Sequence, residues 1–182
     1  MPGIILAFDN YRPKIDPAAW VAPNAVVLGD VEIGPGSSIW YGCVLRADGN
    51  ALRIGARTNI QDGTVVHLNH QEDGGRGAHG FACTIGSDVT IGHMALIHAC
   101  TLEDGAFVGM KACVMDGVVV EGGGMVAAGA LVTPNKRVRK GELWAGSPAK
   151  LMRQLTPKEM DEFGSTAGYY AEVAAHYRAQ GL

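Results

Sequence analysis

The sequence predicts a mainly β fold, a parallel β-helix in which each coil of the chain stacks on the coil before it. An aliphatic residue returns at every sixth position of the central segment, at Ile85, Ile91 and Ile97. The same period extends toward both ends of the chain, and glycine follows many of its aliphatic positions, where a tight corner leaves little room for a Cβ. A six-residue period is the signature of coils built from three hexapeptides, about 18 residues each.

The period of six continues on both sides of the central segment. Downstream it shifts by one residue and then runs through Leu102, Val108, Val114, Val120, Val126, Val132, Val138 and Trp144. Upstream it runs through Val21, Val27, Ile33, Ile39 and Leu45, and again through Ile54, Ile60 and Val66. These runs predict roughly six to seven coils. The alternative is a sandwich of short strands, but its side chains alternate with a period of two.

The elements follow in order along the chain. An extended lead-in is expected over residues 1–16, because its prolines disfavour a helix. The β-helix follows over residues 17–151. Leu45 and Ile54 are nine residues apart instead of six, which predicts a small bulge at a corner. The period is lost over residues 69–83, which are polar and rich in glycine, as expected for a loop that leaves the wall of the β-helix.

A C-terminal α-helix is predicted within residues 152–182, where the repeats have ended. Residues 156–159 have the composition of a capping box with proline at the first helical position. The apolar residues that follow form a stripe, which predicts packing along the β-helix. The helix is expected to end near Gln180, with a break near Gly164 or Gly168 as an alternative.

Composition excludes several classes of function. The net charge is −3 and the basic residues are not interleaved with aromatic ones, so we expect no nucleic-acid partner. The first residues do not resemble a signal peptide, and no apolar segment is long enough to span a membrane. The four cysteines have no C-x-x-C spacing and are expected to be small packing residues in a reducing compartment. We therefore expect a cytoplasmic protein with no membrane partner.

Two histidines are expected to stack. Val66 and Ile97 are 31 residues apart, which is one coil of about 18 residues plus a loop of about 13. His67 and His98 each follow one of these aliphatic residues, so they should lie one above the other on the same face. Their backbones would then be about 4.8 Å apart. Two imidazoles in this arrangement can bind one metal ion.

A third histidine is expected on another part of the coil. His93 precedes His98 by five residues, an odd number, so an extended chain would direct the two side chains to opposite sides, roughly 15 Å apart. One chain does not bring the three rings together, but a threefold trimer does if His93 comes from a neighbouring subunit. Three histidines with one open position are the ligand set of a catalytic zinc site.

Several segments together resemble the gamma-class carbonic anhydrase family of the hexapeptide-repeat superfamily. The resemblance covers nearly the whole chain. It is carried by L-R-A-D (Leu45–Asp48), N-I-Q-D-G-T-V-V-H (Asn59–His67), I-G-H-M-A-L-I-H (Ile91–His98) and the late G-S-P-A-K. The resemblance implies a left-handed β-helix and a homotrimer with metal sites at the subunit interfaces. It also implies that the metal ligands are His67, His93 and His98.

The resemblance further implies a metal-dependent lyase that converts carbon dioxide to bicarbonate. The cofactor would be Zn²⁺, with Fe²⁺ or Co²⁺ as alternatives, and a metal-bound hydroxide would attack carbon dioxide. Gln61 would hydrogen-bond the metal-bound water or hydroxide. Arg46, Asp48 and Asp62 would form a charged network that supports the site and the subunit contacts, or that is structural alone. Tyr170 is a further candidate, which either reaches the site from the C-terminal helix or packs in the core.

The chain departs from the resemblance at the group that carries protons away from the site. Well-characterised members have Glu where this chain has Gly49, and their acidic loop is weakly represented here. His70 or His79 is an alternative proton carrier, because imidazole exchanges protons near neutral pH. Either residue is equally well explained as a solvated loop residue.

Two other functions remain open at this point. One is a hexapeptide-repeat acyltransferase or thioesterase that binds coenzyme A and uses a histidine as general base. Such an enzyme has no need for two histidines stacked one coil apart. The other is a catalytically silent trimer that holds a metal, which the glycine at position 49 favours.

Overall fold

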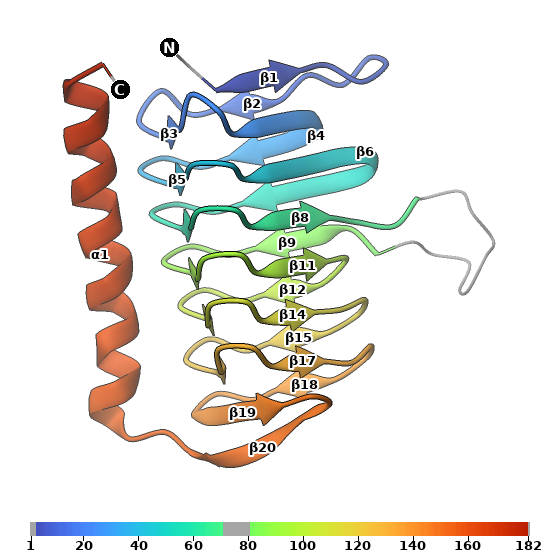
Figure 1. The fold of residues 1–182 in the computed structure, drawn as a ribbon, viewed down its shortest axis with the longest axis vertical. Helices are drawn as coiled ribbons and strands as arrows, with labels where there is room; N and C mark the ends of the chain where they lie inside the picture. Colours follow the sequence, from blue (N-terminus) through green and yellow to red (C-terminus); the bar gives the residue numbers. More distant parts are fainter. Residues whose placement is uncertain (1–2, 71–80, 182) are drawn as a thin grey trace.

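The computed structural model describes residues 3–70 and 81–181, and it forms a parallel β-helix of seven coils with one C-terminal helix (Figure 1). The predicted fold class is therefore confirmed. Most inward positions of the six-residue period are buried, and they align from coil to coil, as where the fully buried Ile60, Ile91 and Val108 pair in register. Burial of each such side chain contributes about 1.5–3 kcal/mol to stability.

Each coil has three faces. The first and second faces belong to one twelve-stranded sheet, because the long strand β6 (Val44–Ile54) pairs with β8 at its start and with β9 at its end. The first face also contains β1 (Ile4–Leu6), the start of β4 (Val26–Ile33), β8 (Val65–His67), β11 (Leu96–His98), β14 (Cys113–Val114) and β17 (Leu131–Val132). The second contains β2 (Lys14–Ile15), the end of β4, β9 (Cys83–Ile85), β12 (Thr101–Leu102), β15 (Val119–Val120) and β18 (Arg137–Val138).

The third face is a separate eight-stranded sheet. Its strands are β3 (Trp20–Val21), β5 (Ser38–Ile39), β7 (Asn59–Ile60), β10 (Thr90–Ile91), β13 (Phe107–Val108), β16 (Met125–Val126), β19 (Glu142–Gly146) and β20 (Ala149–Gln154). Seven of them are parallel, and β20 pairs antiparallel to β19. Residues 152–154, expected in the helical segment, therefore extend a strand that closes the last coil.

The N-terminal lead-in belongs to the sheet, although it is extended as expected. β1 and β2 both pair with β4 in parallel, so they form part of the first coil. The extra residues between Leu45 and Ile54 lengthen β6 around a corner, and the register shift that they cause lies opposite, between Gly29 and Val31 of β4. Corners of neighbouring coils are close: a Cβ added to Gly34 would lie 2.7 Å from the carbonyl carbon of Gly55.

The C-terminal helix α1 (Pro157–Ala179) lies against the third face, where it contacts β3, β5, β7 and β10 (Figure 1). Its start is the predicted capping box: the Thr156 side chain accepts a hydrogen bond from the Glu159 backbone N–H, and the Glu159 side chain accepts one from the Thr156 backbone N–H. The helix continues through both glycines without a break. No helix in residues 3–70 and 81–181 combines the length and apolar character that crossing a membrane requires.

Candidate metal centre

His67 and His98 stack as the six-residue period predicts. They are paired residues of the neighbouring strands β8 and β11, and both lie at the carboxyl end of the first face. His67 Nδ1 lies 3.2 Å from His98 Nε2, and the ring centroids are 5.2 Å apart. Both side chains are partly buried. The stacking thus presents two ring nitrogens to one small volume.

The outer nitrogen of each stacked ring has a carboxylate partner. His67 Nε2 lies 3.2 Å from Asp48 Oδ1, and His98 Nδ1 lies 2.5 Å from Asp116 Oδ1. A carboxylate accepts hydrogen bonds, so each outer nitrogen carries the proton in the neutral ring and each inner nitrogen keeps its lone pair. Burial lowers the pKa of His67 below its usual value, which favours that neutral form.

The two inner nitrogens suit a divalent metal ion. Two lone pairs that face each other at 3.2 Å repel unless a cation lies between them. The separation also matches two nitrogens that each lie about 2.0–2.1 Å from one tetrahedral ion. Histidine ligands of metals commonly donate their second ring N–H to a carboxylate, as both rings do here. The two ring nitrogens on one chain therefore suit a divalent metal ion of the kind that the sequence analysis expects.

His93 lies at the other end of the first face from His98, whereas the sequence analysis expects the two side chains on opposite sides of an extended chain. It follows β10 in the turn before β11, and its Nδ1 lies 2.9 Å from Asp62 Oδ2. Asp62 occupies the same corner one coil earlier, where its carbonyl accepts a hydrogen bond from the backbone N–H of Met94. In the described part of the single chain, no group of three or more His, Cys, Asp and Glu side chains is arranged to hold a metal ion.

Asp48 is held between a cation and a metal-ligand candidate. Burial raises its pKa, but hydrogen bonds from Arg46 and from His67 outweigh this effect, so the net pKa lies below the usual value for aspartate. Asp48 is therefore ionised near neutral pH and accepts from both neighbours. Arg46 itself is exposed at the surface and forms an ion pair with Asp48.

Asp116 was not singled out by the sequence analysis. It lies 18 residues after His98, which is one coil, so it continues the column that begins with His67. The Asn69 side chain donates a hydrogen bond of 3.1 Å to its second carboxylate oxygen. Burial raises the pKa of Asp116, but the hydrogen bonds from Asn69 and His98 lower it to below the usual value. The one-coil spacing after His98 is the signal that would have identified this residue.

Gln61 and Tyr170 lie near Asp62 rather than beside the stacked histidines. Gln61 follows β7, is buried, and donates a hydrogen bond of 3.1 Å from Nε2 to Asn59 Oδ1. Tyr170 lies on α1 with its ring 5.3 Å from that of Trp40, in a cluster of aromatic side chains. Burial, and next the charge of Asp62, raise the pKa of Tyr170. The core-packing alternative for Tyr170 therefore matches its contacts in the single chain.

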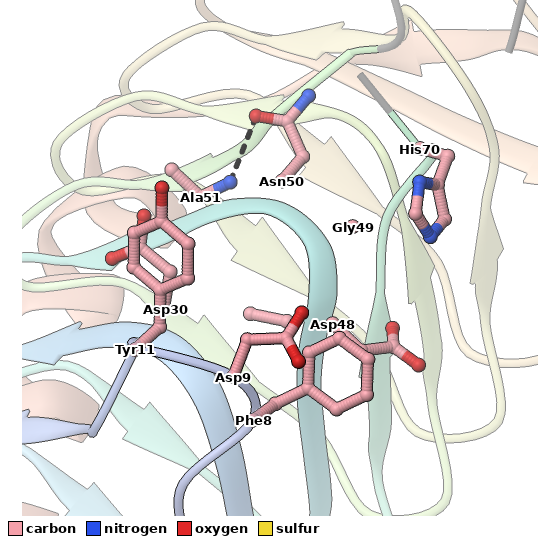
Figure 2. A pocket seen from close by; sticks show the side chains of 10 residues that line it. Phe8, Asp9, Tyr11, Asp30, Asp48, Gly49, Asn50, Ala51 and His70 are labelled. Atoms are coloured by element: carbon pink, nitrogen blue, oxygen red, sulfur yellow. Dashed lines mark hydrogen bonds between the residues drawn. The ribbon is translucent and has the colours of Figure 1, made fainter. Parts of the chain in front are cut away.

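A pocket of about 390 Å³ opens next to Asp48. Figure 2 shows it between the N-terminal segment and β6, with His70 beside Gly49. A Cβ added to Gly49 would lie 2.6 Å from His70 Cδ2, so the glycine leaves the space that the imidazole fills. The pocket lining also includes Asp9 and Asp30. His79, the other candidate proton carrier, lies outside the described residues.

Exposed apolar side chains surround the histidines on the first face. Val65 and Leu96 are paired neighbours on β8 and β11, and both point outward. Met94 and Met110 lie at the His93 corner and are also exposed. Exposed apolar side chains that gather on one face are typical of interaction surfaces. We call these four residues the apolar strip.

Comparisons with known proteins show what the whole chain is similar to. A family described as bacterial transferase hexapeptide (six repeats) matches residues 12–47. Gamma carbonic anhydrase 1 of Arabidopsis thaliana, a mitochondrial protein, is 50% identical over 95% of this chain and 62% of its own length. The chain spans less than two thirds of that relative and of Arabidopsis gamma carbonic anhydrases 2 and 3. Protein YrdA of Escherichia coli K12 is 36% identical over 100% of this chain and 97% of its own.

Solved structures share both the fold and the length of the chain. A hexapeptide transferase family protein from Anaplasma phagocytophilum has a TM-score of 0.88 and 44% identity, over 96% of this chain and 98% of its own. A putative acetyltransferase from Bacillus cereus has a TM-score of 0.90 and 30% identity, over 97% of this chain and 98% of its own. Together with the repeats and the sequence relatives, these likenesses assign the chain to the gamma-class carbonic anhydrase-like family of the hexapeptide-repeat superfamily.

Proposed function

We propose that this chain is a metal-dependent, carbonic anhydrase-like lyase that hydrates carbon dioxide to bicarbonate. The observation that carries the proposal is the pair of stacked imidazoles, whose inner nitrogens are 3.2 Å apart while their outer nitrogens face carboxylates. The sequence relatives named gamma carbonic anhydrases support this function over others of the superfamily. Zn²⁺ is the first candidate for the metal, with Fe²⁺ or Co²⁺ as alternatives, because histidine ligands accept several divalent ions.

The active form would be a homotrimer. His67 and His98 supply two ligands from one subunit, and the partner subunit's His93 would supply the third. His93 lies at the opposite end of the first face from His67 and His98. If the first faces of three subunits meet around a threefold axis, the His93 end of one subunit would lie beside the His67 and His98 end of the next. The apolar strip lies between these two ends, where association would bury it.

The chain's own residues would prepare the site for the reaction. A bound divalent ion would supply hydroxide at neutral pH by lowering the pKa of its water to about 7. Asp48 and Asp116 hold the two rings with their lone pairs directed at one volume. Gln61, whose amide is oriented by Asn59, would orient the attacking water by hydrogen bonding across the interface. Arg46 would hold Asp48 in place, and Asp62 would hold His93 in place.

The proton released by hydration would leave through the pocket beside Asp48. His70 is the candidate carrier, because its ring occupies the space above Gly49 at the edge of this pocket. Carboxylates of Asp9, Asp30 and Asp48 line the same pocket. This arrangement would replace the glutamate that well-characterised members carry at position 49.

Two alternatives are kept as outcomes of the test. Solved neighbours that are named acetyltransferases favour a coenzyme A-dependent acyltransferase or thioesterase. However, the groove on the second face, about 390 Å³, contains Glu103 and Asp104, whose charge opposes the phosphates of coenzyme A. The other alternative is a metal-binding trimer without catalytic activity.

The four free thiols suit the reducing, cytoplasmic location that the sequence predicts.

The test combines metal analysis with a hydration assay. Protein purified without chelator is expected to contain about one divalent ion per chain and to accelerate carbon dioxide hydration in a stopped-flow assay. Protein without metal would contradict the metal site and favour the acyltransferase, to be examined with acetyl-coenzyme A. Full metal content without carbon dioxide hydration would contradict the lyase function and favour the catalytically silent trimer.

A further inference from the structure

Three side chains from three coils form a column at the corner where the first face ends. Asn69 donates to one oxygen of Asp116, and the other oxygen lies 2.5 Å from His98 Nδ1. Because both oxygens are engaged, the carboxylate cannot turn away from the imidazole. His98 therefore lies between two partners, with His67 at its Nε2 and Asp116 at its Nδ1.

The backbone also fixes Asp116. Its carbonyl accepts a hydrogen bond of 2.9 Å from the backbone N–H of Asn135, one coil later. The following residue, Gly117, donates its backbone N–H to the carbonyl of Ala99, one coil earlier, at 2.8 Å. Ala99, Gly117 and Asn135 all have positive φ, at 47°, 67° and 60°, so three corners of the same form stack on one another. The position of the carboxylate is thus set by the coils on both sides.

We infer that Asp116, held by Asn69, is a positioning residue that keeps His98 in the tautomer and orientation required of a metal ligand. The inference rests on the proposed function only through its metal site. Asp116 accepts a hydrogen bond from the Nδ1–H of His98, so the lone pair of His98 stays at Nε2, directed at His67 Nδ1. Without Asp116 the neutral ring can exchange tautomers, and in one of them a proton occupies the ligand position.

The experiment compares the wild-type protein with Asp116→Ala, Asp116→Asn and Asn69→Ala. Asp116→Ala removes the acceptor, whereas Asp116→Asn keeps an oxygen that can accept from Nδ1 without its charge. Asn69→Ala leaves the carboxylate in place but frees it to rotate. Asp88→Asn is the control, because it removes a carboxylate from an exposed ion pair with Arg57 rather than from a contact with His67 or His98. Thermal unfolding of each metal-free variant verifies that it is folded.

Two readouts separate positioning from a structural role. Imidazole ¹⁵N NMR of the metal-free protein should show His98 as the Nδ1–H tautomer in wild type and Asp116→Asn, and as a mixture in Asp116→Ala. Zn²⁺ affinity, measured by competition with a chelator, should fall 10–100-fold in Asp116→Ala and less in Asp116→Asn and Asn69→Ala. Asp88→Asn should retain wild-type affinity.

Unchanged tautomer and unchanged Zn²⁺ affinity in folded Asp116→Ala would overturn the inference. Neither readout involves carbon dioxide. The experiment therefore tests the inference independently of the proposed reaction. Wild-type protein that binds no Zn²⁺ would overturn both.

Discussion

At the scale of single residues, the side chain of His98 connects the candidate metal centre to the β-helix. Its ring contacts His67 on one coil and Asp116 on the next, and it points away from the aliphatic core. Replacing it should therefore affect metal binding far more than folding, because the inward neighbour Ile97 remains fully buried.

We expect His98→Ala to abolish metal binding while the coils stay folded. One ligand of three is lost, and the remaining pair would lie on different subunits. Metal content per chain can be measured by atomic emission and folding by circular dichroism. His176→Ala, in the last turn of α1, is the control and should keep full metal content. Metal at full stoichiometry in His98→Ala would contradict the ligand assignment.

His70→Ala should slow carbon dioxide hydration by about 10²-fold at low buffer concentration, the lower end of the range for a positioned proton-transfer group. The ring lies against Gly49 beside the pocket that Asp48 lines, so its loss removes a proton carrier without touching a metal ligand. Added imidazole buffer should restore the rate. Equal rates for wild type and His70→Ala at low buffer would show that protons leave by another route.

At the scale of elements, the hexapeptide period predicts the strands whose inward residue is aliphatic and buried. It also places His67 opposite His98, because stacking of Val66 on Ile97 fixes the register of the following residue. It does not predict β1, β2 or β20, since these strands expose apolar residues such as Ile4 and Leu151 and follow no repeat.

The candidate site was only partly predictable for a related reason. A site residue can be identified from the sequence when it lies in one of the segments that resemble the family, as His93 does. Asp116 lies outside those segments, and its role depends on a contact made one coil away. The position of His70 above Gly49 depends on where the loop leaves the coil, which no period specifies.

The start of α1 gives a pH-dependent prediction. Hydrogen bonds from Arg153, and next from Thr156, lower the pKa of Glu159 to about 2. A carboxylate whose pKa is lowered in the folded state stabilises that state above its unfolded pKa, and the contribution is lost as the pH falls toward the folded value. Glu159→Gln should therefore lower the melting temperature at pH 7, and the difference from wild type should shrink between pH 5 and pH 3. A difference that is constant with pH would contradict this.

At the scale of the whole molecule, the three faces have different surroundings. The helix α1 covers the third face. The second face carries ion pairs such as that of Arg137 with Glu121. The first face presents the apolar strip with histidines at both of its ends, and no described element covers it. The first face is therefore where association with further copies of the chain should occur.

A charge on the apolar strip should separate the subunits and release the metal together. Leu96→Asp places a carboxylate on a side chain that is 42% exposed in the single chain, two residues before His98. If first faces meet in a trimer, burying that charge is costly, and sedimentation should change from trimer to monomer. Because the third ligand comes from the partner subunit, bound Zn²⁺ should fall at least tenfold in the same sample.

Leu151→Asp is the matched control: Leu151 is 48% exposed but lies on β20 at the far end of the stack, so this variant should stay trimeric and metal-bound. A wild-type protein that sediments as a monomer, or a Leu96→Asp monomer that keeps its metal, would show that the third ligand does not come from a neighbouring subunit.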